Sequence, residues 1–279
     1  MLIALASLSL LAAADANCGP GHPVLVENWR AEGFGNPESL LPDGEGGFFI
    51  SNVAGEAAER NGEGHISRSW GDGTIRDARW VEGLNAPKGL TISEGRLFVT
   101  DIDDLVEIEI WSGEILARHS VDGAGFLNDA AALPDGRILF TDSANARIYV
   151  YDGTSISVWM EDERLGGVNG LWPETDRLVV TTMAEGYVLA IDWDDLSTQI
   201  LAEGLTNADG IARWCEGYLI SQWPGVISYL HDDGRVQSLL DQREAGILMN
   251  DFVIHDGKLM IPNWNPGTIW AFDLQRMQY

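Results

Sequence analysis

Residues 128–142 have the sequence Asn-Asp-Ala-Ala-Ala-Leu-Pro-Asp-Gly-Arg-Ile-Leu-Phe-Thr-Asp. A polar residue begins this segment, a Pro-Asp-Gly turn follows, and a run of β-forming residues ends it. Five further segments are organised alike, and the first residues of the six lie 50, 40, 41, 40 and 41 positions apart. A β-rich unit that recurs about every forty residues is the signature of a propeller blade. The residues that begin the segments, called the anchor residues below, are Glu38, Lys88, Asn128, Asn169, Asp209 and Asn250.

The anchor residues predict a shared site. Each precedes the end of its β-rich run by 13 or 14 residues, and these runs end at Asn52, Asp101, Asp142, Thr182, Gln222 and Asn263. The repeat therefore predicts one all-β domain over residues 17–279, a six-bladed β-propeller. Radial repetition places equivalent residues on one ring around the central axis. We therefore expect the six anchor side chains to meet at one mouth of the propeller channel.

The two ends of the chain predict how the ring closes. Only thirty residues remain from Asn250 onward, enough for about three strands. Residues 23–29, Pro-Val-Leu-Val-Glu-Asn-Trp, favour a strand and precede the first anchor residue. We expect them to supply the outer strand of the last blade, so that pairing of the N- and C-terminal strands removes an exposed sheet edge. The longer first interval contains a polar, Gly-rich insertion from Gly55 to His65, which we expect to form a loop.

The N-terminus predicts export. Residues 2–14 form an apolar or small-residue run that is too short to span a bilayer. The sequence Ala14-Asp15-Ala16 has the small-x-small form of a signal-peptide cleavage site. We therefore expect residues 1–16 to be a signal peptide and the protein to be periplasmic or secreted. The two cysteines, Cys18 and Cys215, would be able to pair after export, although two cysteines alone do not define a disulfide framework.

The charge of the chain limits its partners. The formal net charge is −26, from 43 acidic and 17 basic residues. Such a surface repels nucleic-acid phosphates and anionic membranes, so we expect no nucleic-acid partner and no membrane partner once the leader is removed. We expect a monomer whose partner is a small-molecule substrate or ligand.

The composition of the anchor ring suggests a cation. The carboxylates of Glu38 and Asp209 would face the amide oxygens of Asn128, Asn169 and Asn250, and hard divalent ions such as Ca²⁺ prefer oxygen ligands. Zinc would more often recruit His or Cys, and the five histidines lie off the anchor positions. The alternative is that these polar residues cap loops or hydrogen-bond one another.

Lys88 is the one basic member of the ring. Its ammonium group would be able to neutralise Glu38 and replace a metal ion, or to hold an anionic substrate. A third possibility is that it bridges the carboxylates structurally or turns away to solvent. The residue type does not decide among these roles.

Four motifs stand in order along the chain: Pro-Glu-Ser (37–39), Phe-Leu-Asn-Asp (126–129), Val-Asn-Gly-Leu (168–171) and Ala-Asp-Gly-Ile (208–211). Together they resemble the SMP-30/gluconolactonase/luciferin-regenerating family over nearly the whole chain beyond the leader. The resemblance implies a six-bladed propeller, a divalent metal held by Glu38, Asn169 and Asp209, and Asn128 as a substrate contact or further ligand. Members of that family hydrolyse lactones or organophosphates. The chain departs from the sugar-lactone-hydrolysing members at Phe126, where they carry an arginine, and at Lys88.

Two functions of different classes follow from these residues. The first is a divalent-metal-dependent hydrolase of a lactone or related ester, in which the ion polarises the carbonyl group. Asp129 or Asp209 would act as base or nucleophile. The substrate would contact Asn128, Lys88 and Asn250. The second is a propeller without turnover, whose ring of Lys88 and asparagines binds a small ligand.

Overall fold

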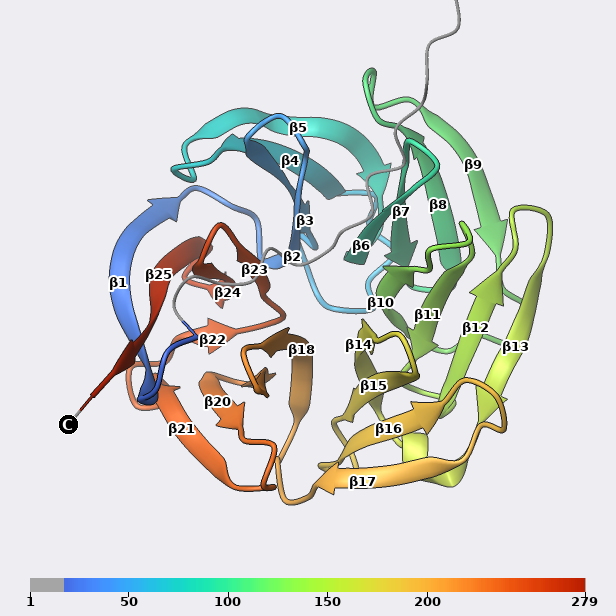
Figure 1. The fold of residues 1–279 in the computed structure, drawn as a ribbon. Coiled ribbons are helices and arrows are strands. Elements are labelled where there is room, and N and C mark those ends of the chain that lie inside the picture. The colour runs from blue at the N-terminus through green and yellow to red at the C-terminus, as the bar shows by residue number, and fades with distance from the viewer. Residues whose placement is uncertain (1–17, 279) are drawn as a thin grey trace, which may run out of the picture.

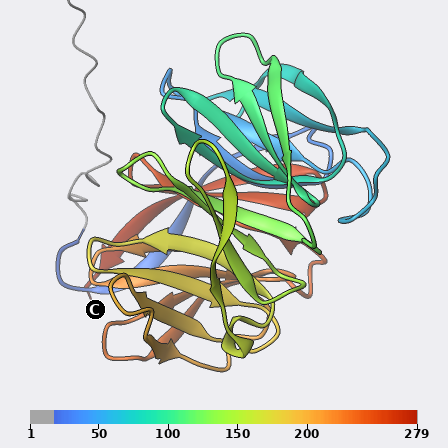
Figure 2. The same ribbon diagram turned by 90° about the vertical axis from the view of Figure 1, so that its right-hand side faces the viewer.

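The chain folds into six antiparallel sheets arranged around a common axis, as seen in a computed structural model that describes residues 18–278 (Figure 1). Five sheets contain four strands in sequence order, and the sixth combines strands from both ends of the chain. The expected all-β six-bladed propeller is therefore confirmed. Each blade is a twisted sheet, seen from the side in Figure 2. Within residues 18–278 the one helix is η1 (Glu163–Leu165), and no helix there is long and apolar enough to cross a membrane.

In blades one to five the strands follow one another along the chain from the innermost outward. Blade one contains β2 (Pro37–Pro42), β3 (Gly47–Asn52), β4 (Gly64–Trp70) and β5 (Ile75–Leu84). Blade two contains β6 (Pro87–Ser93), β7 (Arg96–Asp101), β8 (Asp104–Glu109) and β9 (Ile115–Ser120). Blade three contains β10 (Leu127–Ala132), β11 (Ile138–Asp142), β12 (Arg147–Tyr151) and β13 (Ile156–Glu161). Blade four contains β14 (Val168–Pro173), β15 (Arg177–Thr182), β16 (Val188–Asp192) and β17 (Thr198–Ala202). Blade five contains β18 (Ala208–Trp214), β19 (Gly217–Gln222), β20 (Val226–Leu230) and β21 (Val236–Asp241).

Blade six closes the ring with the N-terminal strand. Its members are β22 (Leu248–Met249), β23 (Val253–His255), β24 (Lys258–Asn265), β25 (Thr268–Met277) and, on the outside, β1 (His22–Glu32). The first strand pairs antiparallel with the last, from His22 opposite Met277 to Glu32 opposite Thr268, and the two lie side by side in Figure 1. This confirms the predicted closure, in which residues 23–29 form part of the longer β1.

Most strand ends agree with the predicted period. Strands β3, β7, β11, β15 and β19 end at the residues where the β-rich runs were expected to end, whereas β24 continues two residues beyond Asn263. The insertion in blade one is a loop only up to residue 63. Gly64 and His65 belong to β4, because His65 pairs with Asn52 and Gly64 with Leu84. The expected loop boundary at His65 was therefore wrong by two residues.

Apolar side chains from neighbouring blades fill the space between the sheets. Six separate clusters of buried side chains each join one pair of adjacent blades, including the pair formed by blades six and one. Blades five and six, for example, share Trp214, Leu259 and Trp270. Because burial of apolar surface is the dominant favourable term in folding, these interfaces hold the blades in fixed positions around the axis.

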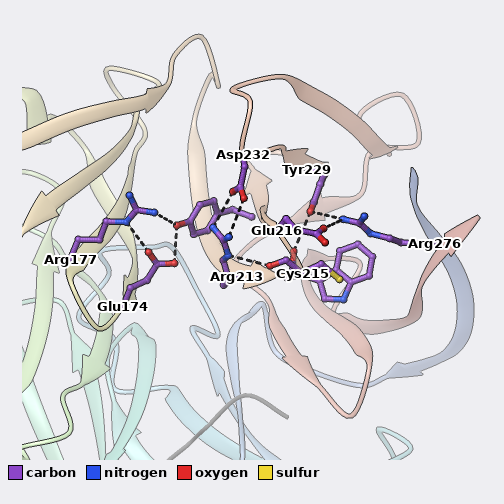
Figure 3. A network of polar contacts seen from close by, with 10 residues as sticks. Glu174, Arg177, Arg213, Cys215, Glu216, Tyr229, Asp232 and Arg276 are labelled. Carbon is purple, nitrogen blue, oxygen red and sulfur yellow. Dashed lines mark hydrogen bonds and ion pairs between the residues drawn. The ribbon is translucent and has the colours of Figure 1, made fainter. Parts of the chain in front are cut away.

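A disulfide attaches the N-terminal segment to blade five. Cys18 is bonded to Cys215, which lies in the turn between β18 and β19, and their Cα atoms are 5.4 Å apart. Figure 3 shows the network of polar contacts around this turn, in which Arg213 Nε donates to the Cys215 carbonyl oxygen over 3.2 Å. Arg276 of β25 donates to Glu216 over 2.6 Å and to Tyr229 over 3.1 Å. The disulfide therefore joins the closing segment to the hairpin that β25 also contacts. The expected signal peptide, residues 1–16, lies outside the described residues.

Candidate functional site

A recurring irregularity places the anchor residues. In blades one to five the innermost strand begins one residue before its anchor, and its pairing with the next strand shifts register immediately after that first residue. In blade six, Asn250 lies in the gap between β22 and β23. Such bulges redirect side chains and are common beside functional sites. All six anchor residues therefore occupy equivalent positions, and their exposed fractions range only from 2% for Lys88 to 7% for Glu38.

Hydroxyl groups on the second strands stabilise the bulges. The backbone N–H that follows an anchor residue donates to a Ser or Thr hydroxyl of the neighbouring strand in four blades. A backbone N–H left without a partner in a buried position would cost free energy, and the hydroxyl group removes that cost. The four donor and acceptor pairs are Ser39 with Ser51 at 2.9 Å, Asp129 with Thr141 at 3.0 Å, Gly170 with Thr181 at 2.9 Å and Gly210 with Ser221 at 2.8 Å.

The three asparagines of the ring all use their amide NH₂ groups on neighbours. Asn169 Nδ2 donates to Asp209 Oδ1 over 2.5 Å and lies 3.3 Å from Met183 Sδ. Asn128 Nδ2 donates to Ser143 Oγ over 3.2 Å, and Asn250 Nδ2 donates to the Pro37 carbonyl oxygen over 2.9 Å. Because each NH₂ group is engaged, the amide oxygen is the atom each residue has left for another partner.

Two carboxylates lie one position further along the inner strands. Asp129 follows Asn128, and Asp251 follows Asn250; both are half-buried. Asp129 accepts from the backbone N–H groups of Ala130 and Leu171, each over 2.7 Å, and thereby joins blades three and four. Asp251 accepts from Ser39 Oγ over 2.7 Å, joining blades six and one.

Glycine provides the room for Asp251. A Cβ atom on Gly210, which is the equivalent residue in blade five, would lie 2.0 Å from Asp251 Oδ1. A side chain larger than hydrogen at position 210 would therefore displace this carboxylate.

Burial and mutual repulsion raise the pKa values of these acids. Burial is the main cause for all four carboxyl groups. The neighbouring Asp209 and Asp251 further raise the pKa of Glu38, and Asp251 further raises the pKa values of Asp129 and Asp209. Burial raises the pKa of Asp251 itself to about 6, against the hydrogen bond from Ser39. The anchor ring and the two adjacent aspartates thus contain four carboxyl groups and one lysine that lie near enough to influence one another's pKa values.

Lys88 is anchored by backbone oxygens. Its Nζ donates to the carbonyl oxygens of Ala57, over 2.8 Å, and of Ala86, over 2.9 Å, and lies 4.3 Å from the centre of the Phe126 ring. Burial lowers the pKa of Lys88 to about 8, although the nearby carboxylates of Glu38 and Asp101 oppose this shift. Ala57 belongs to the inserted loop of blade one, so the ammonium group fastens that loop to blade two.

Two buried oxygens of the ring have no hydrogen-bond partner. They are Glu38 Oε2 and Asn128 Oδ1, both among the atoms proposed from the sequence as metal ligands. Unpartnered buried oxygens are costly, and carboxylate and amide oxygens are the donors that Ca²⁺ prefers. The donor set therefore fits a hard divalent cation. Within residues 18–278 no three His, Cys, Asp or Glu side chains form a candidate metal group; the expected set has two carboxylates, and its other members are amides.

Sequence reasoning missed three residues of this site. Asp251 lies at the same blade position as Asp129, which was the signal that would have identified it. Ser143 and Met183, which contact Asn128 and Asn169, each directly follow the end of a β-rich run. The chain position of such residues is visible in the sequence, but their contact with an anchor residue is not.

Comparison with known proteins identifies the fold. A gluconolactonase from Xanthomonas campestris is similar in structure, with a TM-score of 0.66 and 17% identity over 94% of this chain and 92% of that chain. A virginiamycin B lyase from Staphylococcus aureus gives a TM-score of 0.64 and 14% identity over 86% and 80%. A chain of the nidogen/laminin complex gives a TM-score of 0.62 and 20% identity over 79% and 90%. No protein-family model and no curated protein sequence matches the chain. Two enzymes of different classes and a chain of a protein–protein complex thus share this propeller fold.

Proposed function

We propose that the protein hydrolyses a lactone or related ester with the help of one divalent cation, of which Ca²⁺ suits the donors best. The observation that carries this proposal is the pair of unpartnered buried oxygens, Glu38 Oε2 and Asn128 Oδ1, beside Asp209 and Asn169. Glu38, Asn128, Asn169 and Asp209 would hold the ion. When bound, such an ion supplies positive charge that polarises a carbonyl group and offsets the charge of the carboxylates.

Asp209 is the stronger candidate for the base. Both carboxylate oxygens of Asp129 already accept backbone N–H groups, whereas for Asp209 the contact in the ring is the one from Asn169 to Oδ1. In our proposal the Asp209 carboxylate takes a proton from the attacking water as the water oxygen bonds to the ester carbon. The carbon–oxygen bond of the ester then breaks, and the proton passes to the leaving oxygen. The products are a hydroxyl group and a carboxylic acid, as hydrolysis requires.

Metal content and turnover must be measured together. We expect purified protein incubated with excess calcium and then dialysed to retain a divalent ion by elemental analysis, and to open lactones in a pH-stat assay. Asp209→Asn should lose both properties. Asp194→Asn, which changes an exposed aspartate after β16, should keep both. Retained turnover in Asp209→Asn would contradict the assigned base, and wild-type protein without metal or turnover would contradict the hydrolase.

A second candidate is a propeller that binds a small ligand without turnover. The burial of all six anchor residues, at exposures of 7% or less, favours this candidate because it limits the access of the additional water molecule that hydrolysis requires. It predicts that calorimetry detects binding of a small molecule, and that binding weakens in Lys88 or asparagine variants. No product would form under the same conditions.

The compartment and assembly are part of the same proposal. We infer an exported, monomeric protein, with no nucleic-acid or membrane partner after leader removal. The Cys18–Cys215 disulfide supports export, because structural disulfides persist mainly in oxidising compartments. Cell fractionation of the tagged full-length chain, followed by size-exclusion chromatography, tests both statements.

A further inference from the structure

The channel mouth carries a second set of residues above the anchor ring. The residue before each anchor pairs with a residue at or near the end of the adjacent strand, and the residue that follows this partner in the chain lies at the mouth. We call these six the mouth residues. Five of them are apolar, and only one carries a hydroxyl group. They are Val53, Ile102, Ser143, Met183, Trp223 and Trp264.

Contacts connect these side chains with the ring and with one another. Met183 Sδ lies 3.3 Å from Asn169 Nδ2, so the thioether stands directly against an anchor residue. Trp264 packs against a cluster of Val53, Ala86 and Ile102, and therefore reaches from blade six to blades one and two. Trp223 and Trp264 meet edge to face, with ring centres 6.2 Å apart.

Phe126, which directly precedes β10 of blade three, adds a further apolar side chain beside the anchor ring. Its ring lies 4.3 Å from the ammonium group of Lys88. Phe126, Met183, Trp223 and Trp264 are each half-buried, so they keep part of their apolar surface accessible where the anchor residues are covered.

The one hydroxyl group among the mouth residues is already used. Ser143 Oγ accepts from Asn128 Nδ2 over 3.2 Å and donates to the Val168 carbonyl oxygen over 2.7 Å. The hydroxyl groups of a polyhydroxylated substrate would lose their hydrogen bonds to water on binding here. Trp, Met and Phe side chains offer few hydrogen bonds to replace them, so binding would cost free energy. An alkyl or aryl substituent would instead gain by leaving water.

We infer that the mouth residues select an apolar substrate, namely a lactone that carries an alkyl or aryl substituent in place of hydroxyl groups. This inference rests on the proposed hydrolase function for the ester group. The substituent lies against Met183, Trp223 and Trp264 while the carbonyl group approaches the anchor ring. Trp223 and Trp264 are the specificity-determining residues.

Three lactones with the same six-membered ring test this inference. They are δ-decalactone with a pentyl chain, δ-valerolactone with no substituent, and glucono-δ-lactone with hydroxyl groups. We expect kcat/KM for δ-decalactone to exceed the value for glucono-δ-lactone by at least about tenfold. Trp223→Ala should lower kcat/KM for δ-decalactone about tenfold and leave δ-valerolactone nearly unchanged.

Controls separate loss of specificity from loss of folding. Trp111→Ala removes a tryptophan that is 74% exposed in the turn after β8, and it should keep the wild-type preference. Trp264→Phe retains an aromatic ring against the Val53 cluster and should show an intermediate loss. Melting temperatures of all variants identify any that fail to fold, and Trp264→Phe then replaces Trp223→Ala as the decisive variant.

A binding measurement distinguishes this inference from the hydrolase proposal. Calorimetry with 6-pentylpiperidin-2-one, a lactam that resists hydrolysis, reports binding without turnover. If no lactone is hydrolysed but the lactam binds and Trp223→Ala weakens it, the hydrolase proposal fails and the apolar selectivity holds. If glucono-δ-lactone is preferred, or if preference survives in Trp223→Ala, the selectivity is overturned while the hydrolase stands. Absence of both hydrolysis and lactam binding overturns both.

Discussion

Asn169 donates its side-chain amide to Asp209 Oδ1 over 2.5 Å, although the two residues lie 40 positions apart in sequence. They occupy the same position in neighbouring blades. The contact fixes the asparagine amide so that its oxygen remains for another partner. It also places a hydrogen-bond donor on a carboxylate whose pKa is raised by burial and by the nearby Asp251. A substitution in this pair therefore tests the geometry of the anchor ring most directly.

The Asp209→Asn substitution should have opposite effects on thermal stability in the absence and in the presence of calcium. We expect Asp209→Asn to raise the melting temperature of the metal-free protein, because the change removes one of several buried acidic groups. The gain in unfolding free energy should be about 1 kcal/mol. The same change should weaken calcium binding about 100-fold and abolish the calcium-dependent rise in melting temperature. Thermal denaturation with chelator or with calcium measures both effects. Equal calcium stabilisation of variant and wild type would contradict the ligand assignment.

Lys88→Met tests the ammonium group that fastens the inserted loop. The variant keeps most of the apolar stem but leaves the carbonyl oxygens of Ala57 and Ala86 without this donor. We expect a loss of about 1–3 kcal/mol in unfolding free energy and faster proteolysis within residues 53–63. Calcium affinity should rise, because the site becomes one unit more negative.

The only other lysine is the matched control for this change. Lys258 is partly exposed and lies 3.5 Å from Asp273, so Lys258→Met should alter the unfolding free energy by no more than about 0.5 kcal/mol. Unchanged stability, proteolysis and calcium affinity in Lys88→Met would show that the ammonium contacts have no structural or electrostatic role.

The hairpin of blade one contains a buried ion pair with a predictable pH dependence. Asp43 Oδ1 accepts from the backbone N–H groups of Glu45 and Gly47, and Oδ2 lies 3.1 Å from Arg68. These contacts, opposed by burial, lower the pKa of Asp43 below its usual value of 3.8. The stability they contribute is therefore present above about pH 4 and is lost as the pH falls through the lowered pKa.

Asp43→Asn should destabilise the protein by about 1–3 kcal/mol at pH 7, and the difference from wild type should shrink below pH 4. Asp135→Asn alters the corresponding Pro-Asp-Gly turn of blade three, where Asp135 and Arg137 are both exposed, and should cost much less. Chemical denaturation at several pH values measures these differences. If the difference in unfolding free energy between Asp43→Asn and wild type stays constant from pH 7 to pH 3, an ionised Asp43 is not its source.

Reduction of the Cys18–Cys215 disulfide should weaken the closure of the ring. The bond joins residues 197 positions apart, and a loop of that length corresponds to about 5 kcal/mol in the chain-entropy description. We expect dithiothreitol, or the double change Cys18→Ser with Cys215→Ser, to lower the melting temperature. The double variant should not respond further to dithiothreitol. Two reactive thiols in denatured, unreduced protein would contradict the bond.

The sequence by itself determined the architecture of this protein. The spacing of the six anchor residues predicted six blades, and the strand-forming segment at 23–29 predicted the closing strand that is now seen as part of β1. These features are predictable because each blade repeats one local pattern of turn and strand, whose period is visible without knowledge of any contact. The equivalence of the anchor positions follows from the same period.

Only the tertiary structure decided what each of these side chains contacts. It pairs Cys18 with Cys215, directs Lys88 to two carbonyl oxygens, and commits Asp129 to backbone N–H groups of two blades. It also places Asp251 where its charge raises the pKa values of Glu38 and Asp209. These outcomes depend on which blade lies beside which and on the room that a residue such as Gly210 leaves for a neighbour. A repeat fixes where equivalent residues stand, but hydrogen bonds and burial across blades fix their orientation and their charge.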